Sequence, residues 1–415
     1  MPPVPGRRGR SGRSQLVRRR LIVFSAVAIL GVLAVYLPLT LLAPLAPTSA
    51  RLVPFSTPYR VATLPMLPGY GASAVGAIGY PEAFATAGST EALPIASISK
   101  IVTSLVVLEA KPLWPGDSGP TITFSATDAA LRAKYVALNG ETKPLTAGAT
   151  ISQLDLMRVT LIASANNYAD ALMGWAFGSR AAFEFAVTAW LSSHGLNHTT
   201  ILEPTGINPG NVSTATDLVE IGKLALANPV IASIVSTETM TLAGVGSFAN
   251  TNTLLGQLGV EGIKTGTLDR RSNLLFAATF RFGSHAVTVV GAVVGAIDHR
   301  AVDATVTTLL AGMKAGFHEV TLAKKGETFA DFTTVWSEKA RAVSSRAASL
   351  LVWSNTPVTA VISALPARVG ETGAPIGRVT FTAGSQSVVV PLSLDHRLID
   401  PGPWWRLSNP TRFSG

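Results

Sequence analysis

The stretch PIASISKIVTSLVVLEA, residues 94–110, decides the fold of this chain. Its apolar residues recur at helical spacing just after a proline, which predicts a buried helix. Ser97 and Lys100 stand three residues apart near the start of that helix, so their side chains share one helix face. A lysine whose pKa is depressed by burial and by positive surroundings can take the proton of a neighbouring serine. The positive end of the helix dipole adds to that effect.

A polar break at Ser164-Ala165-Asn166 interrupts the helical pattern of residues 153–176. A hydroxyl and an amide at this point are suited to pass a proton to a leaving group and to bind a substrate carbonyl. The alternative is a helix cap, because serine and asparagine favour such positions. The motif by itself leaves both interpretations open.

A third group, Lys264-Thr265-Gly266 followed by Thr267, lies in a strand-like run. A lysine and a hydroxyl together suit a substrate carboxylate, and glycine allows another segment of backbone to approach closely. The Thr267 N–H suits an oxyanion hole paired with the Ser97 N–H. The alternative is an edge-strand lysine that discourages aggregation.

Outside these motifs, the hydrophobic pattern predicts strands, then a helical block, then strands again. The expected strands are 73–80, 84–88, 259–266, 274–282 and 286–296, and the expected helices are 94–110, 153–176, 217–227 and 301–315. The last two strands are joined by Gly283-Ser284, a hairpin-like connection. This order predicts an α+β fold in which an antiparallel sheet carries helices.

After Lys325 the pattern changes to short strand candidates separated by turn residues. These candidates are residues 349–354, 359–365, 377–384 and 386–394. They predict a small, sandwich-like, all-β domain at the C-terminus.

The formal net charge of +9 is concentrated in the N-terminal tail. Residues 1–20 contain seven arginines and no acidic residue, so subtracting seven from nine leaves +2 for residues 21–415. A nearly neutral body argues against a nucleic-acid partner. The chain has no cysteine, which excludes disulfides, thiolate metal sites and a cysteine nucleophile. The histidines show no metal-ligand spacing.

An uncharged segment of 25 residues, Leu21–Leu45, follows the arginines and is long enough to span a bilayer. Arginines before it predict a cytoplasmic N-terminus and an exported body. We expect an uncleaved single-pass anchor in the cell membrane, and the alternative is a signal peptide cleaved near Thr48-Ser49-Ala50, with secretion of the body. The expected segments are a cytoplasmic Arg-rich tail (1–20), this anchor or signal segment (21–45), a Pro-rich linker (46–65), a catalytic domain (66–318) and a β-rich domain (319–415).

Taken together, the three motifs resemble the ordered signature of penicillin-binding proteins and serine β-lactamases: S-x-x-K, S-x-N and K-T-G. The flanking sequences LIASANN (161–167), PTGI (204–207), STATDLVEIGKLAL (213–226) and NTNTLLGQLGVEGIKTG (250–266) are similar to those of serine-type D-alanyl-D-alanine carboxypeptidases. These are the low-molecular-mass penicillin-binding proteins of peptidase family S11. The resemblance covers roughly residues 66–316 and implies a β-lactamase/transpeptidase-like domain. The β-rich region after it resembles the C-terminal domain that many members carry.

The resemblance also implies a role for each motif residue. Ser97 would be acylated by the D-Ala-D-Ala end of a peptidoglycan stem pentapeptide, with Lys100 as its base and Ser164 as proton relay. Asn166 would hold the substrate and Lys100. Lys264 and Thr265 would receive the terminal carboxylate beside Gly266 and Thr267. Water would then release the acyl group, β-lactams would trap the same intermediate, and no metal or cofactor would be needed.

Several features depart from the family pattern or imitate other sites. Residues 267–272, TLDRRS, replace the usual continuation after K-T-G, and Asn167 stands where aspartate is common. The loop 116–120, GDSGP, is like a chymotrypsin nucleophile loop, but no histidine precedes it, so we interpret it as a turn. Asp298-His299 is interpreted as a helix start. Trp404-Trp405 is interpreted as core packing, the alternative being contact with a wall or membrane partner.

Three alternative functions stay open at this point. Glu203-Pro204 is like the acidic deacylation residue of class A β-lactamases, which would make the chain a β-lactamase. A peptidoglycan endopeptidase would use the same motifs. The unusual residues 268–272 leave room for a wall-binding scaffold without turnover. The intact motif residues argue against the scaffold, and the P-T-G-I context of Glu203-Pro204 resembles the carboxypeptidase pattern.

Overall fold

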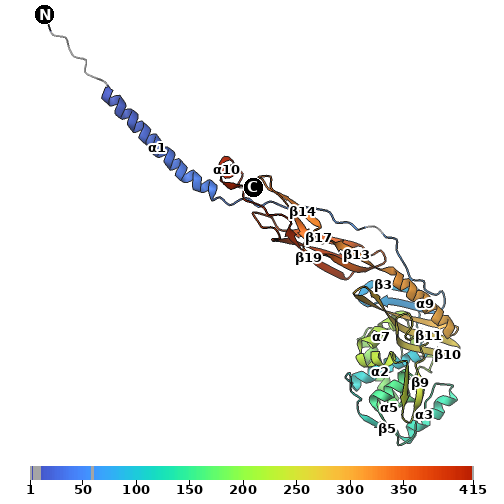
Figure 1. Cartoon of the computed structure of the whole chain (residues 1–415). Coiled ribbons are helices and arrows are strands. Elements are labelled where there is room, and N and C mark those ends of the chain that lie inside the picture. The colour runs from blue at the N-terminus through green and yellow to red at the C-terminus, as the bar shows by residue number, and fades with distance from the viewer. Residues whose placement is uncertain (1, 3–10, 58–59, 414–415) are drawn as a thin grey trace.

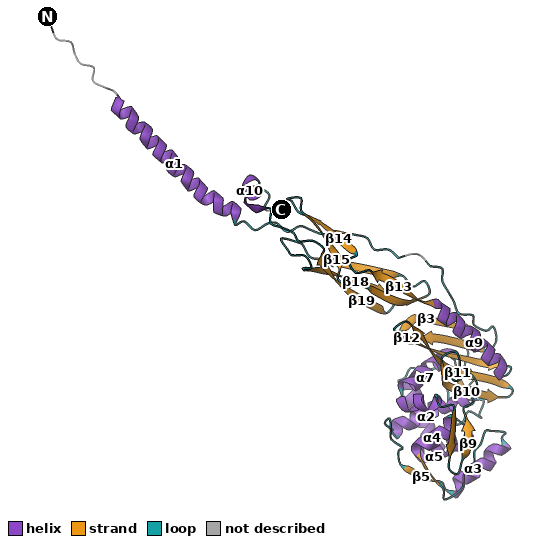
Figure 2. Cartoon of the chain, viewed as in Figure 1, coloured by secondary structure: helices purple, strands orange, loops and turns teal. Residues whose placement is uncertain are grey.

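The computed structural model describes residues 2, 11–57 and 60–413. Residues 1 and 3–10 of the predicted basic tail, Pro58 and Tyr59 of the predicted linker, and residues 414–415 of the predicted β-rich domain lie outside the described residues. Figure 1 shows an elongated molecule in which helix α1 (Ser11–Leu41) leads to a β-rich module, and a mixed helix and sheet body lies at the far end. Figure 2 shows the same division by secondary structure.

The body is built on a five-stranded antiparallel sheet with the order β10-β11-β12-β2-β3. Its strands are β2 (Ala72–Ala77), β3 (Tyr80–Gly88), β10 (Val260–Leu268), β11 (Arg271–Phe282) and β12 (His285–Ala296). The two predicted strands at the start of the body form one hairpin, β2–β3. The hairpin predicted at Gly283-Ser284 joins β11 and β12. The predicted α+β class is confirmed.

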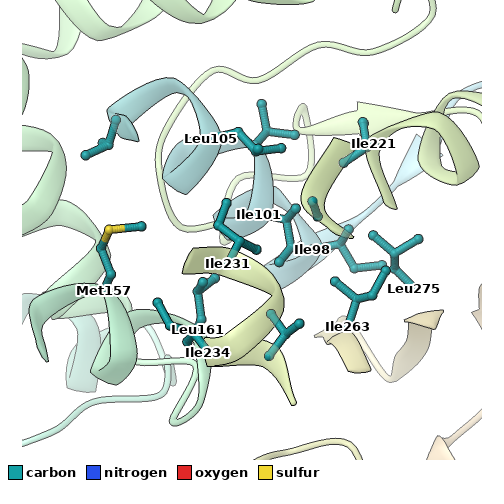
Figure 3. Close-up of a cluster of buried hydrophobic side chains, with 14 of the residues drawn as sticks. Ile98, Ile101, Leu105, Met157, Leu161, Ile221, Ile231, Ile234, Ile263 and Leu275 are labelled. Atoms are coloured by element: carbon teal, nitrogen blue, oxygen red, sulfur yellow. The ribbon is translucent and has the colours of Figure 1, made fainter. Parts of the chain in front are cut away.

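Helices cover both faces of this sheet. The helices of the body are α2 (Ser99–Ala110), α3 (Ala126–Ala137), α4 (Gln153–Leu161), α5 (Asn166–Phe177), α6 (Arg180–Ser193), α7 (Ala215–Ala227), α8 (Pro229–Val235) and α9 (His299–Gly316), of which α7 and α8 lie on one face of the sheet and α9 on the other. Alternate residues of β11 serve opposite faces: Leu275 belongs to the helical core around α2 and α7, whereas Phe276 packs in the cluster beneath α9. Figure 3 shows the first core, where Ile98 and Ile101 meet Ile263 and Leu275.

The predicted helix at 94–110 begins later than the sequence pattern indicated. Leu93–Pro94 forms the short strand β4, Ala96–Ile98 forms the 3-10 turn η1, and α2 begins only at Ser99. The backbone of Ala96 has φ of 50°, a left-handed conformation that L-residues rarely adopt. The nucleophile candidate Ser97 therefore sits in a strained turn between a strand and a helix, one turn ahead of Lys100.

Three pairs of short strands complete the body. They are β4 with β7 (Val212–Ser213), β5 (Thr121–Thr123) with β6 (Thr150–Ser152), and β8 (Thr239–Leu242) with β9 (Gly246–Ala249). The pairing of β4 with β7 ties the segment before Ser97 to the loop that follows residue 200. This loop forms part of the candidate site.

The β-rich module follows α9 and contains two sheets. Six strands have the order β1-β14-β15-β19-β18-β17, and β13 pairs with β16. The bounds are β1 (Arg51–Leu52), β13 (Phe317–Ala323), β14 (Thr328–Thr333), β15 (Lys339–Ser344), β16 (Ala348–Trp353), β17 (Val358–Ala364), β18 (Pro375–Ala383) and β19 (Gln386–Leu394). The core between the sheets includes Leu350, Val379 and Phe381, as expected for a sandwich-like domain.

The Pro-rich segment after α1 is extended, as predicted, but it is bound to the module along part of its length. Thr48 forms a β-bridge with Ala367, and β1 pairs with β14 as the edge strand of the larger sheet. Phe55 packs edge-on against Phe381, with ring centroids 4.9 Å apart. The N-terminal segment thus completes a C-terminal domain.

The chain ends in a short helix, α10 (Gly402–Ser408), that lies beside the end of α1 (Figure 1). The Tyr36 hydroxyl donates to the Leu407 carbonyl at 2.7 Å, and Arg406 donates to the Ala43 carbonyl at 2.6 Å. The prediction that Trp404 packs in a core is wrong, because its side chain is 83% exposed. Trp405 instead contacts Trp336 edge-on.

Candidate active site

Lys100 is the centre of the candidate site. Its side chain is fully buried, and its Nζ donates to the Ser97 Oγ at 2.8 Å, the Asn166 Oδ1 at 2.6 Å and the Thr205 carbonyl at 2.7 Å. These three acceptors come from η1, α5 and the loop after residue 200. The predicted S-x-x-K pair is therefore in hydrogen-bond contact, and the asparagine of the second motif contacts the same ammonium.

Burial changes the protonation of this lysine. Desolvation is the main cause that lowers the pKa of Lys100 well below its usual range, and the charge of nearby Lys264 lowers it further. Glu203 and Glu141 oppose that shift with their negative charges. A lysine that loses its proton readily is suited to act as a base toward the hydroxyl it contacts.

The polar break between α4 and α5 lies in the same cleft. Ser164 has φ of 57° and is almost fully buried, while Asn166 is the first residue of α5. Ser164 lines a cavity of about 570 Å³ together with Ser97 and Asn166. Within the described residues the Ser164 hydroxyl makes no hydrogen bond, so it faces the cleft without joining the Lys100 network. Asn166 belongs to the hydrogen-bond network of Lys100, and the N-cap position of α5 is Ala165 instead.

The third motif lies on β10, the edge strand of the sheet, next to η1. Lys264 is only 1% exposed, so the alternative of a solvent-facing lysine that guards the edge is excluded. Burial lowers the pKa of Lys264 to about 7, partly offset by Glu141. Its Nζ donates to the Thr251 hydroxyl at 3.2 Å, and that hydroxyl also hydrogen-bonds the Thr265 hydroxyl.

Gly266 lets β10 approach the nucleophile turn. A Cβ at this position would lie 2.7 Å from the Ile95 carbonyl and 3.3 Å from the Ser97 nitrogen, so a larger residue would push the strand away. Gly266, Thr265 and Thr267 all line the cleft. Six of the eight predicted site residues therefore line the cleft, and the other two, Lys100 and Lys264, are buried and hydrogen-bond residues that line it.

The loop Glu203–Asn208 provides one of the three acceptors of Lys100, the Thr205 carbonyl. The Glu203 carboxylate is buried and accepts the N–H groups of Thr205 at 2.9 Å and Gly206 at 2.5 Å. It also accepts the Thr205 hydroxyl at 2.7 Å. These contacts hold the Thr205 carbonyl toward Lys100. The Glu203 carboxylate binds donors of its own loop and does not line the cleft. Its position therefore argues against Glu203 as a β-lactamase-type deacylation residue.

Asn167, the departure after S-x-N, fixes the opposite wall of the cleft. Its amide accepts the Lys143 N–H at 3.2 Å and donates to the Lys143 carbonyl at 2.9 Å. The loop before Lys143 contains Glu141, which lines the cleft and influences the pKa of both buried lysines. An asparagine is sufficient for this contact with the backbone.

Sequence reasoning missed His299 as a cleft residue. Asp298 caps α9 by accepting the Ala301 N–H at 2.8 Å, so the predicted helix start is confirmed. In addition, the His299 Nε2 lies 2.7 Å from the Thr267 Oγ1, and the ring lines the cleft. No local sequence pattern indicates this contact, because α9 and β10 are far apart in the sequence and lie side by side only in the folded chain. The 116–120 loop is an exposed turn, as predicted.

This architecture is the fold of low-molecular-mass penicillin-binding proteins. The chain is similar to penicillin-binding protein 5 from Haemophilus influenzae with a TM-score of 0.56 and 18% identity, over 84% of this chain and 100% of that one. The family model of peptidase S11, D-alanyl-D-alanine carboxypeptidase, matches residues 84–294. The chain therefore belongs to the peptidase S11 family.

Two relatives illustrate the range of that family. A D-alanyl-D-alanine endopeptidase of Escherichia coli K12 is 33% identical over 199 residues, which cover 45% of this chain and 59% of the relative. The D-alanyl-D-alanine carboxypeptidase DacA of the same strain is 28% identical over 246 residues, 58% of this chain and 59% of the relative. The matches thus span about three fifths of each relative's length.

Proposed function

We propose that this protein is a membrane-anchored serine D-alanyl-D-alanine carboxypeptidase that removes the terminal D-Ala from peptidoglycan stem pentapeptides. The observation that carries the proposal is the contact of the buried Lys100 Nζ with the Ser97 Oγ at 2.8 Å. Membership of the S11 family and the two motifs around the same cleft support it.

In acylation, the Ser97 Oγ attacks the carbonyl carbon of the penultimate D-Ala while its proton passes to Lys100. The N–H groups of Ser97 and Thr267 stabilise the negative oxygen that forms. The C–N bond then breaks, the proton passes through Ser164 to the leaving nitrogen, and D-Ala departs. In deacylation, water attacks the ester carbonyl and gives a proton to Lys100. The bond between the acyl carbon and the Ser97 Oγ then breaks, Lys100 returns the proton to that oxygen, and the shortened peptide leaves with a new carboxylate.

Substrate binding divides between the two walls of the cleft. Asn166 orients Lys100 and binds the substrate backbone, while Lys264 and Thr265 receive the terminal carboxylate, with Gly266 leaving room for it. This division explains why two lysines are buried side by side without a carboxylate ion pair in the described chain. Lys100 is the base, and Lys264 binds the negatively charged carboxylate of the substrate. The proposed chemistry uses no metal or cofactor.

A fluorescent penicillin tests the proposal. We expect a covalent adduct that maps to Ser97 in the native protein and is absent from Ser97→Ala, together with release of D-Ala from a synthetic pentapeptide. An adduct that hydrolyses within seconds would favour a β-lactamase. The absence of any adduct on Ser97 would contradict the enzyme proposal and leave a wall-binding scaffold.

A peptidoglycan endopeptidase is the second candidate, favoured by the relative that carries this name and is 33% identical. It would use the same Ser97 acyl-enzyme, but the leaving amine would belong to a cross-linked peptide. Incubating the protein with a purified cross-linked dimer and with the pentapeptide separates the two activities. Faster cleavage of the dimer would replace the carboxypeptidase by the endopeptidase.

We also propose that α1 is retained as an anchor with a cytoplasmic N-terminus and an exported body. The helix is long and apolar enough to span a bilayer, and its most apolar window is unburied. Beyond it, the candidate cleavage site begins at Thr48, which is paired with Ala367 in the module. Sequencing the N-terminus of the membrane-bound protein tests this: a start near Arg51 would show cleavage instead.

A further inference from the structure

The β-rich module has a cavity of its own on the outer face of the larger sheet. The cavity has a volume of about 670 Å³, and it is lined by β1, the end of β14, the start of β15 and the chain just after β19. None of the eight site residues proposed for the cleft lines it. Its charged lining residues are Arg51, Asp331, Lys339, Arg341, Asp395 and His396.

Three of these residues form a row across the sheet. The strand register pairs Arg51 with Asp331, and Asp331 with Arg341. Lys339 lies two residues before Arg341 on the same strand, so both side chains point to the same face. Ala340 between them is buried in the module core, so that face is the outer one. Because neighbouring strands are about 4.8 Å apart, the Cα atoms of the three cations lie within roughly 10 Å of Asp331.

The two carboxylates of the cavity do not neutralise these cations fully. The Asp395 Oδ1 accepts the Arg341 backbone N–H at 2.7 Å, and its Oδ2 lies 2.9 Å from the His396 Nδ1. The Asp331 carboxylate lies 3.8 Å from the Arg341 Nε, which is longer than a hydrogen bond. Asp395 is therefore occupied by its neighbours, and Asp331 makes one loose ion pair.

The cations of the cavity have N–H groups available for a ligand. Within residues 11–57 and 60–413, the Arg51 and Lys339 side chains form no hydrogen bond or ion pair, and the Arg341 side chain forms only its loose pair. Three cations minus two carboxylates leave a charge of +1 with His396 neutral. An ammonium has three N–H donors and a guanidinium has five, so the cavity offers donors to an anion.

The cavity lies at the end of the module where α10 meets α1. The turn between β14 and β15, residues 334–338, directly precedes Lys339, and its Trp336 contacts Trp405 of α10 with ring centroids 5.9 Å apart. Helix α10 lies beside the end of α1 (Figure 1). Trp404 on the same helix is 83% exposed, and tryptophan is enriched where a protein meets the bilayer–water interface. With α1 in a bilayer, the cavity therefore lies close to the lipid headgroups.

We propose that this cavity binds the phosphodiester headgroup of an anionic phospholipid. Arg51 and Arg341 donate to the phosphate oxygens, for which the planar guanidinium is suited, and Lys339 adds a point charge. Asp331 accepts a hydroxyl of a polyol headgroup. The bound lipid holds the module against the leaflet and limits its rotation about the segment after α1. This inference rests on the proposed anchoring by α1, because the anchor brings the cavity to the membrane.

The full-length protein in nanodiscs tests the inference, with phosphatidylcholine alone or mixed with phosphatidylglycerol. Acylation of lysines by a water-soluble ester is followed by mass spectrometry. We expect Lys339 to react about fivefold more slowly in the anionic nanodiscs, the factor that corresponds to the attraction of one cation to such a surface. High salt should remove the difference. Lys325, exposed in the turn at the opposite end of β14, is the control and should react equally in both.

Variants separate the cavity from a general attraction to the membrane. Arg51→Gln combined with Arg341→Gln should abolish the protection of Lys339. Arg378→Gln, which removes an exposed cation of the same sheet outside the cavity lining, should leave it unchanged. Penicillin labelling of Ser97 checks that each variant is folded. Equal reaction of Lys339 in the two kinds of nanodisc would overturn the inference, as would protection that survives in the double variant.

Two further outcomes are distinguished by their own controls. Protection of Lys339 by glycerol phosphate in the neutral nanodiscs, to the same extent, would show a site for a soluble phosphate and overturn the lipid proposal. Failure of the anchor has a different signature, namely a protein that starts near Arg51 and leaves the membrane. In that case the released protein should still bind phosphatidylglycerol vesicles and not phosphatidylcholine vesicles, and a lack of binding would overturn the inference too.

Discussion

The cleft around Lys100 and the α1–α10 end of the molecule are held together in opposite ways. In the cleft, short motifs meet in a buried polar network around Lys100. At the other end, single exposed contacts join the two ends of the chain, such as the hydrogen bond from Tyr36 to Leu407 across 371 residues. The cleft therefore depends on a few irreplaceable groups, whereas the α1–α10 end depends on exposed, weak contacts.

This difference predicts a ranking of mutational effects. Removing a buried group that other groups need leaves unsatisfied partners in a low-dielectric interior, which is costly. Removing an exposed contact exchanges it for contacts with water, which costs little. Substitutions in the cleft should change rates by orders of magnitude, and substitutions near α10 should change them hardly at all.

Lys100→Met should have the largest effect. The side chain keeps its length but loses the base, so the rate of penicillin labelling at Ser97 should fall about 10³-fold, the range of general-base catalysis. Stopped-flow or gel-based labelling measures it. Lys223→Met, which removes a half-buried surface lysine paired with Glu220 away from the cleft, is the control and should label at the native rate. A loss smaller than tenfold in Lys100→Met would contradict the role of the lysine as base.

Glu203→Gln should mainly affect stability. The amide cannot accept all the N–H and hydroxyl donors that now surround the carboxylate, so we expect the free energy of unfolding to drop by about 2 kcal/mol. Labelling should also slow, because the Thr205 carbonyl loses its support. Thermal and denaturant unfolding measure the first effect. Glu220→Gln at an exposed position is the control. An equal change in both variants would contradict the proposal that Glu203 stabilises the loop that holds the Thr205 carbonyl toward Lys100.

The two buried lysines should give kcat/KM a bell-shaped dependence on pH. Burial lowers the pKa of Lys100, so activity rises with pH as this lysine loses its proton and becomes a base. Burial also lowers the pKa of Lys264 to about 7, so carboxylate binding weakens as pH rises above that value. A substrate with a carboxamide end should lose the alkaline limb, because it does not need the Lys264 cation. Parallel profiles for both substrates would contradict this assignment.

The same contrast explains what could be predicted from the sequence. Ser97 and Lys100 are three residues apart, so helix geometry alone brings them together. Apolar periodicity likewise predicted the five strands of the main sheet and the helices α2, α4, α5, α7 and α9, but not α3, α6 and α8. By comparison, Thr267 and His299 are separated in the sequence by the strands β11 and β12. They meet only because these strands return the chain so that α9 starts at the edge of the cleft. The local sequence indicates the helix cap at Asp298, but it does not indicate the contact between His299 and Thr267.

The α1–α10 end was the least predictable region for the same reason. β1 has two residues, and it is a strand only because β14 offers an edge to pair with. Trp404 is a large apolar residue of the kind that often lies in a core, but it is on a short helix that contacts α1 and Ala43, and it stays exposed. Long-range contacts between short segments leave no periodicity that a sequence pattern can show.

Arg406→Gln should have the smallest effect and gives the comparison its sharpest test. It removes the contacts of Arg406 with the Ala43 carbonyl and with Asp400, which are partly exposed, so unfolding should change by less than about 1 kcal/mol. Penicillin labelling should be unchanged. Tryptic cleavage at Arg51, followed by mass spectrometry, should nevertheless become faster, because the segment after α1 loses one of its attachments. Arg346→Gln, which removes a similar contact with the Val389 carbonyl away from α1, should not accelerate that cleavage. Equal cleavage in both variants would mean that the β1–β14 pairing alone holds the segment, and that α10 lies beside α1 without restraining it.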